Sequence, residues 1–453
     1  MRRFAAGLSA LLSLVAVSPA SAQEWLADRQ STEGKGVQVG DSLVLHVGLG
    51  LEAGYDTNAL YQADNPDQAV RLRITPYADL GTPRRGGAQE GPEGAPTAAP
   101  KVDFKLGVAA YYDHHFPVGS ANDAAVNDIN GANGVGIDTR AQLVVFPAGK
   151  FSFLADLMYL RSQQAYETTQ DALRCRHEIS PSVGVRLRPG GGTLSIEAGY
   201  RLRLMVFEDP TLGNQLNRHG HEVRVSTSWK FFPKTALVSR VTFTPTFYMG
   251  QDSVKEASYP VRSLFGLQSL IANKFGLLLL AGYGVSNYAR GPNFSSVIAQ
   301  VELMFFITPV STIRVGGERN FVDSFYANYY TKTGGYVSYS QQFGGVFLAT
   351  LRGDVSGRQY APYNHYTPDG SAIPSSEGGT YHDRVDIWAG ATLTLEYRTT
   401  AWLSIIASAR YAADITDFGY QYLDDPDTAE NEAAFVNSSF QKFEGFLGVK
   451  GYY

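Results

Sequence analysis

Three observations on the sequence predict a membrane-spanning antiparallel β-barrel of about 18 strands. Apolar and polar residues alternate with a period of two in segment after segment. The connections between these segments are alternately short and long. The chain has a single cysteine, Cys175, and beyond Ala22 it contains no apolar run long enough for a membrane helix. An exported chain without disulfides needs another source of rigidity, and a closed hydrogen-bonded sheet provides one.

The N-terminus has the features of a secretory signal peptide. Arg2 and Arg3 supply its positive charge, a short apolar stretch follows, and Ala20-Ser21-Ala22 forms a small-residue cleavage site. We therefore expect residues 1–22 to be cleaved and the mature chain to reach the outer membrane of a Gram-negative cell. Residues 23–41 are polar and lack periodicity, so we expect a periplasmic leader there.

The last strand illustrates the alternation. Leu447 and Val449 lie on one face, whereas Lys442, Glu444 and Lys450 lie on the other, because successive side chains of a strand point to opposite sides. The same pattern recurs about 18 times, in segments of roughly 10–15 residues, which is the length of outer-membrane strands. A barrel with one lipid-facing and one lumen-facing phase accounts for this repetition.

Loop lengths distinguish the two ends of the barrel, which we expect to comprise residues 42–453. Short connections such as residues 147–150 alternate with long ones such as residues 162–173 and 355–380. Outer-membrane barrels have short periplasmic turns and long extracellular loops, so both termini should be periplasmic. The Gly/Pro-rich residues 82–100 are an exception, a flexible insertion on the short-turn side. A docking site for a periplasmic partner is the alternative interpretation of this insertion.

The pattern is interrupted in two ways. Pro76, Pro181 and Pro245 fall inside strand segments, where they should mark bulges or interrupted pairing, because proline removes a hydrogen-bond donor from the ladder. Residues 312–321 and 327–341 alternate only weakly. The strand boundaries are least defined there, and a count of 16 strands stays open.

No enzyme or metal site emerges from the residues. His219 and His221 could share one face of a strand, but they lack cysteine or carboxylate partners at metal-ligand spacing. The sequence has no phosphate-binding loop, nucleophile elbow or His-Glu-x-x-His motif. We therefore expect no enzyme activity, metal or cofactor. A net charge of −5 gives no reason to expect a nucleic acid as partner.

The polar phase of the strands carries more bases than acids, and its arginines concentrate between residues 174 and 262. This predicts a basic arc along one wall of the lumen, and a cationic lining favours anions. The alternative is that these arginines pair with acids across strands and stiffen the wall. The basic arc consists of Arg186, Arg188, Arg201, Arg203, Arg224, Arg240 and Arg262.

Two stretches resemble the opening of a large family of outer-membrane β-barrel porins. In that family the first strand ends in a Gly-Tyr-Asp-x-Asn-like turn, as in Gly54-Tyr55-Asp56-Thr57-Asn58, and a proline sits in the second strand, as in Leu72-Arg73-Ile74-Thr75-Pro76. The chain looks similar to the myxobacterial exopolysaccharide-export porins of this family. The resemblance implies an 18-stranded channel with a polysaccharide as cargo, a periplasmic polysaccharide-export protein as partner, and no catalytic residues.

Three functions follow as hypotheses. The first is an outer-membrane channel for export of a secreted polysaccharide, working with periplasmic polysaccharide-export machinery. The second is an anion-preferring diffusion porin for small solutes. The third, from another class, is a barrel enzyme or adhesin that acts through its extracellular loops. Each of them places outer-membrane lipid around the barrel.

Overall fold

The computed structural model contains one large antiparallel sheet and a separate two-stranded hairpin. The predicted signal peptide and most of the predicted leader lie outside the described residues, as does nearly all of the insertion at residues 82–100. The structure describes residues 36–40, 42–82, 101–119, 123–162, 175–250, 255–272, 274–289, 291–324, 327–362, 384–416, 418–422 and 434–453.

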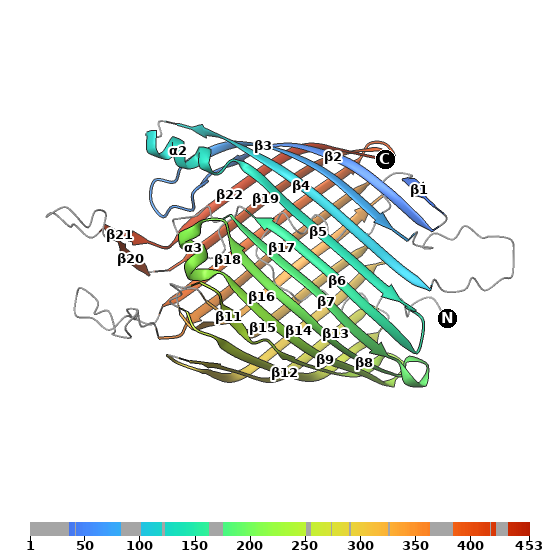
Figure 1. The fold of residues 1–453 in the computed structure, drawn as a ribbon. Coiled ribbons are helices and arrows are strands. Elements are labelled where there is room, and N and C mark those ends of the chain that lie inside the picture. Colours follow the sequence, from blue (N-terminus) through green and yellow to red (C-terminus); the bar gives the residue numbers. More distant parts are fainter. Residues whose placement is uncertain are drawn as a thin grey trace. The chain divides into compact units, whose positions relative to one another are not determined.

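The strands follow one another around the sheet in chain order, and consecutive strands pair (Figure 1). The elements are β1 Val37–Val39, β2 Leu43–Asp56, β3 Gln68–Gly81, β4 Val102–Val118, α2 Asp123–Gly131, β5 Gly134–Val145, β6 Phe151–Ser162, β7 Arg176–Leu187, η2 Pro189–Gly192, β8 Leu194–Phe207, α3 Pro210–Leu216, β9 Arg218–Phe232, β10 Thr235–Phe243, β11 Thr246–Tyr248, β12 Ser258–Ala272, β13 Phe275–Tyr288, β14 Phe294–Thr308, β15 Ser311–Asp323, β16 Tyr329–Phe343, β17 Phe347–Tyr360, β18 Val385–Arg398, β19 Leu403–Ile415, β20 Gly419–Tyr422, β21 Ala434–Asn437 and β22 Phe440–Tyr452.

The sheet closes into a barrel because its first long strand pairs with its last. β2 and β22 are antiparallel, with Leu51 opposite Val449. Of the twenty segments in the sheet, β10 and β11 are two halves of one strand, and β1 is a short addition to β2. The predicted count of 18 wall strands is thereby confirmed, and the alternative of 16 is wrong. β1 lies within the segment expected to be an irregular leader, and it pairs with the start of β2 beyond the end of β22.

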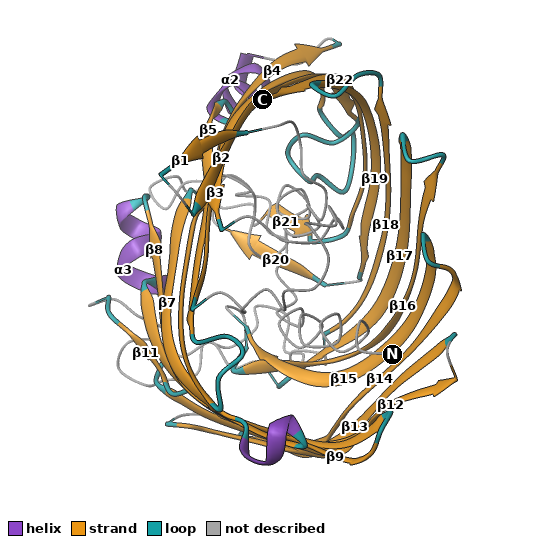
Figure 2. Ribbon diagram, turned by 90° about the vertical axis from the view of Figure 1, so that its right-hand side faces the viewer, coloured by secondary structure: helices purple, strands orange, loops and turns teal. Residues whose placement is uncertain are grey.

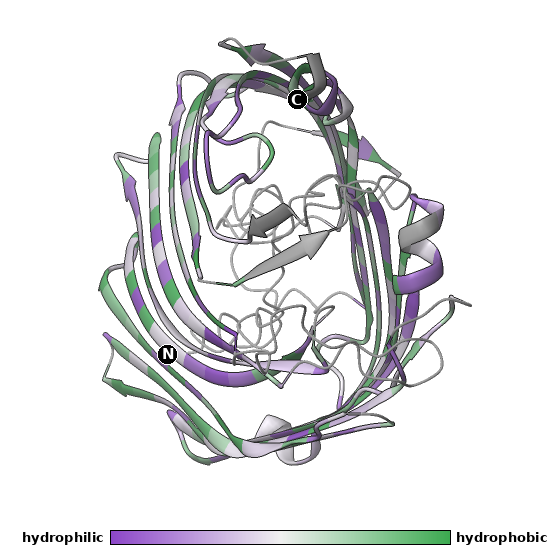
Figure 3. Ribbon diagram, turned by 90° about the vertical axis from the view of Figure 1, so that its left-hand side faces the viewer, coloured by the Kyte–Doolittle hydropathy of each residue, from purple (hydrophilic) through white to green (hydrophobic). Residues whose placement is uncertain are grey.

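Hydrophobic and hydrophilic residues alternate along the strands of the wall (Figure 3). On β14, Val301 and Leu303 point outward and are 41% and 49% exposed, whereas Ile298 points inward and is buried. Large apolar side chains are left uncovered in this way on the outer surface of nearly every strand. A soluble protein rarely exposes so large an apolar surface, whereas a wall that faces lipid requires one. Among the described residues, no helix is long and apolar enough to cross a membrane.

The two ends of the barrel differ as expected (Figure 1). Except between β3 and β4, strands are joined by short turns at one end, where the C-terminal Tyr453 also lies, and connections are longer at the other end. We call these the turn end and the loop end. The loop end carries α2 and α3, two short helices that the sequence pattern did not predict. That the turn end faces the periplasm stays a prediction.

The three prolines lie where the ladder is interrupted, as predicted. Pro76 and Pro181 fall in gaps of the β3–β4 and β7–β8 pairing, and the register is the same on both sides of each gap. Pro245 separates β10 from β11. Each proline therefore costs two ladder positions without shifting the alternation of the faces.

β14 and β15 separate at the loop end. Their last pair is Ala299 opposite Arg319, although β13 still pairs with β14 as far as Phe294 and β16 still pairs with β15 as far as Asp323. Arg262 of β12 donates to Asn320 and Phe321 of β15, although two strands lie between β12 and β15. The end of β15 is therefore turned inward, over the inner face of β13 and β14 (Figure 2).

Candidate functional site: the charged wall of the lumen

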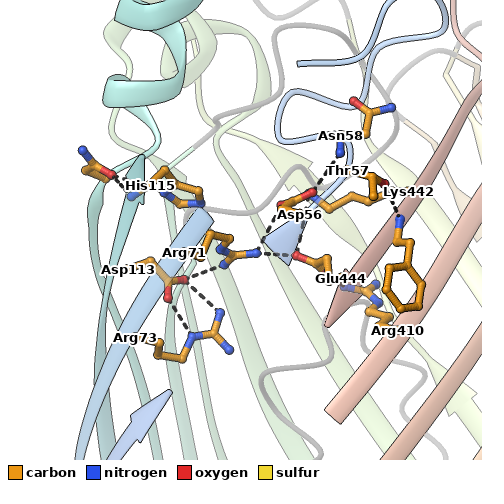
Figure 4. Close-up of polar contacts among 12 residues, drawn as sticks. Asp56, Thr57, Asn58, Arg71, Arg73, Asp113, His115, Arg410, Lys442 and Glu444 are labelled. Carbon is orange, nitrogen blue, oxygen red and sulfur yellow. Dashed lines mark hydrogen bonds and ion pairs between the residues drawn. The ribbon is translucent and has the colours of Figure 1, made fainter. Parts of the chain in front are cut away.

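A cluster of ionised side chains joins the first and last strands on the inner face of the barrel, towards the loop end (Figure 4). Its members come from β2, β3, β4, β19 and β22. They are brought together because β22 closes onto β2 and β19 pairs with β22. This cluster, which we call the seam network, consists of Asp56, Arg71, Arg73, Asp113, Arg410, Lys442 and Glu444.

Arg71 is the centre of the seam network. Its Nη2 donates to Asp113 Oδ2 at 2.8 Å, and its Nη1 contacts Glu444 and lies 3.4 Å from Asp56 Oδ2. Arg73 binds the same Asp113 through two hydrogen bonds of 2.7 and 2.9 Å. One guanidinium thus contacts three carboxylates while only 5% of Arg71 is exposed. Buried charges are tolerated when they are paired and hydrogen-bonded in this way.

The motif that resembles the porin family builds the corner of the seam network. Asp56 Oδ1 accepts a hydrogen bond from the backbone N–H of Asn58 at 3.0 Å, which is an Asx turn. Asn58 Nδ2 in turn donates to the carbonyl of Gln441 at 3.0 Å, beside Lys442. Lys442 Nζ binds Asp56 Oδ2 at 2.7 Å. The sequence showed the motif but not this role, because the partners come from the other end of the chain.

Aromatic rings near the seam are covered by cations. The Phe446 ring has the guanidinium carbons of Arg71 and Arg73 at 5.2 and 5.1 Å from its centroid. On the opposite side of the seam, Arg358 lies 4.3 Å from the centroid of Trp388. Such cation–π contacts occupy ring faces that a sugar would otherwise stack against. These aromatic residues therefore contribute to the wall itself.

Three members of the basic arc pair with acids across strands. Arg186 donates to Glu197 Oε2 at 3.0 and 2.8 Å, and Arg224 Nη2 lies 3.9 Å from Glu197 Oε1. Arg203 forms an ion pair with Glu222. These three arginines therefore fit the alternative interpretation, in which the arginines pair with acids across strands and stiffen the wall.

Arg188 and Arg262 bind uncharged partners. Arg188 lies in the turn after β7, where its Nη2 donates to Ser152 Oγ at 3.0 Å and to the carbonyl of Pro147. Burial and the neighbouring Arg186 lower the pKa of Arg188, but an arginine titrates so far above neutrality that its charge persists. Arg262 is engaged by the inward-turned end of β15.

Arg201 and Arg240 differ from the rest of the arc. Within the described part of the chain, neither forms a hydrogen bond or an ion pair. Arg201 is opposite Glu222, Arg224 is opposite Thr242, and Arg240 is opposite Ser226. Arg201, Arg224 and Arg240 thus follow one another on β8, β9 and β10, and Arg224 is a charged neighbour of both others.

The wall beside Arg201 is hollowed. Gly184 and Gly199 are opposite each other on β7 and β8, and both line a small cavity. Polar residues of four neighbouring strands line this small cavity. They are Asp156, Ser182, Glu197, Arg201, Glu222 and Arg224.

The histidines considered as metal ligands lie elsewhere. His219 and His221 are on the outward phase, where they pack against Phe247 with ring centroids 5.4 and 6.1 Å apart. His221 Nδ1 is 2.7 Å from the hydroxyl of Tyr200. Among the described residues, no group of three His, Cys, Asp or Glu side chains has the arrangement of a metal site.

Comparisons with known proteins find solved structures of low similarity. No family model and no curated protein matches the chain. The outer membrane protein opdK from Pseudomonas aeruginosa matches 90% of this chain and 99% of its own at 12% identity and a TM-score of 0.42. OccAB4 from Acinetobacter baumannii matches 90% and 98% at 7% identity and a TM-score of 0.44. The siderophore receptor PirA from P. aeruginosa matches 92% and 81% at 8% identity and a TM-score of 0.42. Values this low do not transfer a function.

Proposed function

We propose that this chain is a channel of the Gram-negative outer membrane through which small anionic solutes diffuse. The observation that carries the proposal is the row of Arg201, Arg224 and Arg240 on three successive strands of the inner wall, two of them without an ion-pair partner among the described residues. Unpaired guanidinium groups on a channel wall lower the electrostatic cost of anion entry.

The charges around the row support the sign of the preference. The basic arc contains seven arginines, and the carboxylates near it are Asp156, Glu197, Glu222 and Asp323. The seam network is nearly balanced, with four cations and three carboxylates. The surplus of positive charge therefore falls on the wall from β7 to β12, and a wall of one sign attracts counter-ions.

The barrel itself supports the location. β2 pairs with β22, so the sheet closes on itself. Its outer surface is apolar at alternate residues, as a lipid-exposed wall requires. The predicted signal peptide at residues 1–22 provides the route of export. Wide barrels of this strand number enclose a lumen that side chains of the wall alone do not fill.

The proposal is tested by neutralising the two arginines without ion-pair partners. In planar bilayers under a salt gradient, the wild-type barrel should give a reversal potential of anion-selective sign. The variant Arg201→Gln/Arg240→Gln should shift this potential towards zero, because it removes two wall charges while leaving the ion pairs of the arc intact. A cation-selective wild type, or a double variant with unchanged selectivity, would contradict the proposal.

Arg319→Gln is the matched control for the double variant. Arg319 is an exposed arginine on the outward phase of β15, opposite Ala299, and it donates to Thr333. Removing its charge changes the net charge of the protein but not that of the lumen wall. Selectivity of the control should therefore match that of the wild type.

Polysaccharide export with a periplasmic partner is a hypothesis that rests on the resemblance alone. The rings near the seam network are covered by cations and do not offer open stacking platforms for sugars. A deletion strain that still secretes all of its polysaccharides would exclude this function. The enzyme or adhesin hypothesis has no residue of the described loops in its favour.

A further inference from the structure

The separation of β14 and β15 leaves two strand edges unpaired inside a wall that is otherwise continuous. Beyond Ala299, residues 294–298 of β14 pair with β13 only, and beyond Arg319, residues 320–323 of β15 pair with β16 only, within the described part of the chain. Unpaired backbone groups are costly at membrane depth unless protein or water covers them. Such an interruption therefore needs a compensating interaction.

Three side chains of β12 and β13 hold the end of β15 inward. Arg262 Nη2 donates to the Phe321 carbonyl at 2.8 Å, and its Nε donates to Asn320 Oδ1 at 3.2 Å. Asp323 accepts hydrogen bonds from Ser258 Oγ at 2.8 Å and from the Tyr288 hydroxyl at 2.7 Å. All of these are side-chain contacts, and none belongs to the ladder of the barrel.

Phe321 fills the space beneath the turned-in strand. It is fully buried, with its ring stacked on Phe294 at 4.1 Å and the guanidinium carbon of Arg262 at 4.0 Å from its centroid. The ring lies over Gly284, where a Cβ would come within 2.7 Å of it. A glycine at this position therefore makes room for an aromatic ring from a strand that is not its neighbour.

The same sequence fits a second arrangement. If the register of Ala299 and Arg319 continued, Ile298 would face Asn320, Val297 would face Phe321 and Ser295 would face Asp323. Val297 is 56% exposed on the outward phase, so Phe321 would join the lipid-facing surface beside it. Polar Asn320 would stay on the lumen side. The inward-turned and the paired arrangement each satisfy the period-two rule.

We propose that residues 320–323 of β15 are a gate that narrows the channel when turned inward and widens it when they pair with β14. The proposal deepens the diffusion-channel function and rests on it. Opening would remove a layer of chain from the lumen side of β12–β14. It would also release Arg262, a member of the basic arc, from its contacts with Phe321, so that its charge would face the lumen. The open channel should therefore conduct more and prefer anions more strongly than the closed one.

Two disulfide locks that share one cysteine test the gate. Both use Asp323→Cys in a Cys175→Ser background. Ser258→Cys adds a partner whose native side chain contacts Asp323 in the inward-turned arrangement, whereas Ser295→Cys adds the residue that would face position 323 in the paired arrangement. Oxidation should trap both disulfides in the folded barrel, because each arrangement is populated.

Conductance then distinguishes the two locks. The 258–323 lock should lower single-channel conductance below that of its reduced form, and the 295–323 lock should raise it, with reductant reversing both changes. If the 258–323 disulfide does not form, the inward-turned arrangement is wrong. If the 295–323 disulfide does not form, or if the two locks conduct equally, residues 320–323 are a fixed part of the wall and no gate exists.

The variant Phe321→Ala tests the gate independently of the disulfides and has a matched control. Losing the ring weakens the inward-turned arrangement, so the variant should show a larger mean conductance or more frequent large steps. Phe343→Ala removes an exposed phenylalanine of β16 at the turn end and should conduct like the wild type. The heat-dependent shift of mobility on detergent gels verifies that each variant is folded. Unchanged conductance of folded Phe321→Ala would overturn the gate.

The two proposals fail in different ways. A wild-type barrel that forms no channel, or a cation-selective one, overturns the diffusion function, whereas the trapping of the two disulfides is still measurable on gels. If the wild type conducts and prefers anions, but neither disulfide lock changes the conductance, the diffusion function stands and the gate is overturned.

Discussion

Arg71 shows how one side chain can make the seam depend on charge. It is almost fully buried, and the carboxylates of Asp56, Asp113 and Glu444 surround its guanidinium. Each carboxylate alone would be costly at this depth, and together they would repel one another. The arginine therefore stabilises the seam mainly by compensating charges that are already buried.

Replacing Arg71 by methionine should destabilise the barrel more than the loss of one hydrogen bond would. The change leaves buried carboxylates with less compensation, and breaking a buried pair typically costs about 3–5 kcal/mol. Unfolding in guanidinium chloride from lipid vesicles measures the free energy. Arg319→Met is the control, since Arg319 is exposed, and its free energy of unfolding should stay close to that of the wild type. Equal values for the two variants would argue against this role of Arg71.

The sequence predicts the face of each arginine better than its partner. All seven residues of the basic arc lie on strands or a turn of one stretch of wall, as period-two alternation requires. Arg240 lacks an ion-pair partner among the described residues, whereas Arg262 on the next strand is held by Asn320 and Phe321. Partners depend on how strands far apart in the chain approach each other. Local spacing carries no signal of that approach.

At the scale of elements, tyrosines lie across glycines of the neighbouring strand. Tyr111 faces Gly136 in the β4–β5 register, and a Cβ at Gly136 would collide with the Tyr111 ring. The pairs Tyr77–Gly48 and Tyr336–Gly316 repeat this arrangement on other strands. Each ring lies flat against the inner wall because the opposite residue has no side chain. The glycines thus keep large side chains out of the lumen.

Gly136→Ala should destabilise the barrel because the added methyl group displaces the Tyr111 ring. Overpacking of this kind costs about 1–3 kcal/mol. Gly353→Ala is the control, since the nearest atom to a Cβ there is 3.9 Å away. Thermal unfolding of the two variants in detergent should separate them, with a lower midpoint for Gly136→Ala only. A midpoint equal to that of the control would mean that the ring moves at no cost.

Weak alternation marked the elements that leave the regular wall. Residues 312–321 and 327–341, whose boundaries were least defined from sequence, belong to β15 and β16. Phe321 keeps the outward phase of β15, but it is buried rather than facing lipid because the end of its strand is turned inward. The helices α2 and α3 were missed for another reason: each is short and lacks an apolar stripe long enough to read against the surrounding loops.

For the whole molecule, the prediction that matters is which side of the wall faces lipid. Val301→Lys places a charge on the outward face of β14, near the middle of the strand, where it should cost about 2–4 kcal/mol. Gln300→Lys places the same charge on the adjacent inward residue and should be tolerated. Folding into phospholipid vesicles, followed by denaturant titration, compares them directly. Equal stabilities would contradict the assignment of the faces.

Strand number and closure of the barrel were accessible from sequence because they depend on a local period and on turn lengths. The interior of the barrel was not. Whether β15 follows the wall or enters the lumen depends on Arg262, Tyr288 and Gly284, and all three have an ordinary place on the inward phase of their strands. The width of the channel depends on tertiary contacts, whereas the wall depends on secondary structure.

The seam also sets a time order for assembly. β2 and β22 are separated by about 400 residues, so residues 48–56 of β2 have no partner strand on that edge until the end of the chain has arrived. Asp56 and Arg71 come from the beginning of the chain and Lys442 and Glu444 from its end. Three of the seven members of the seam network, Arg410, Lys442 and Glu444, are therefore missing until the last two wall strands, β19 and β22, are in place. Only the complete chain can bring these charges together. Formation of the seam network therefore requires that the last strand has reached the first.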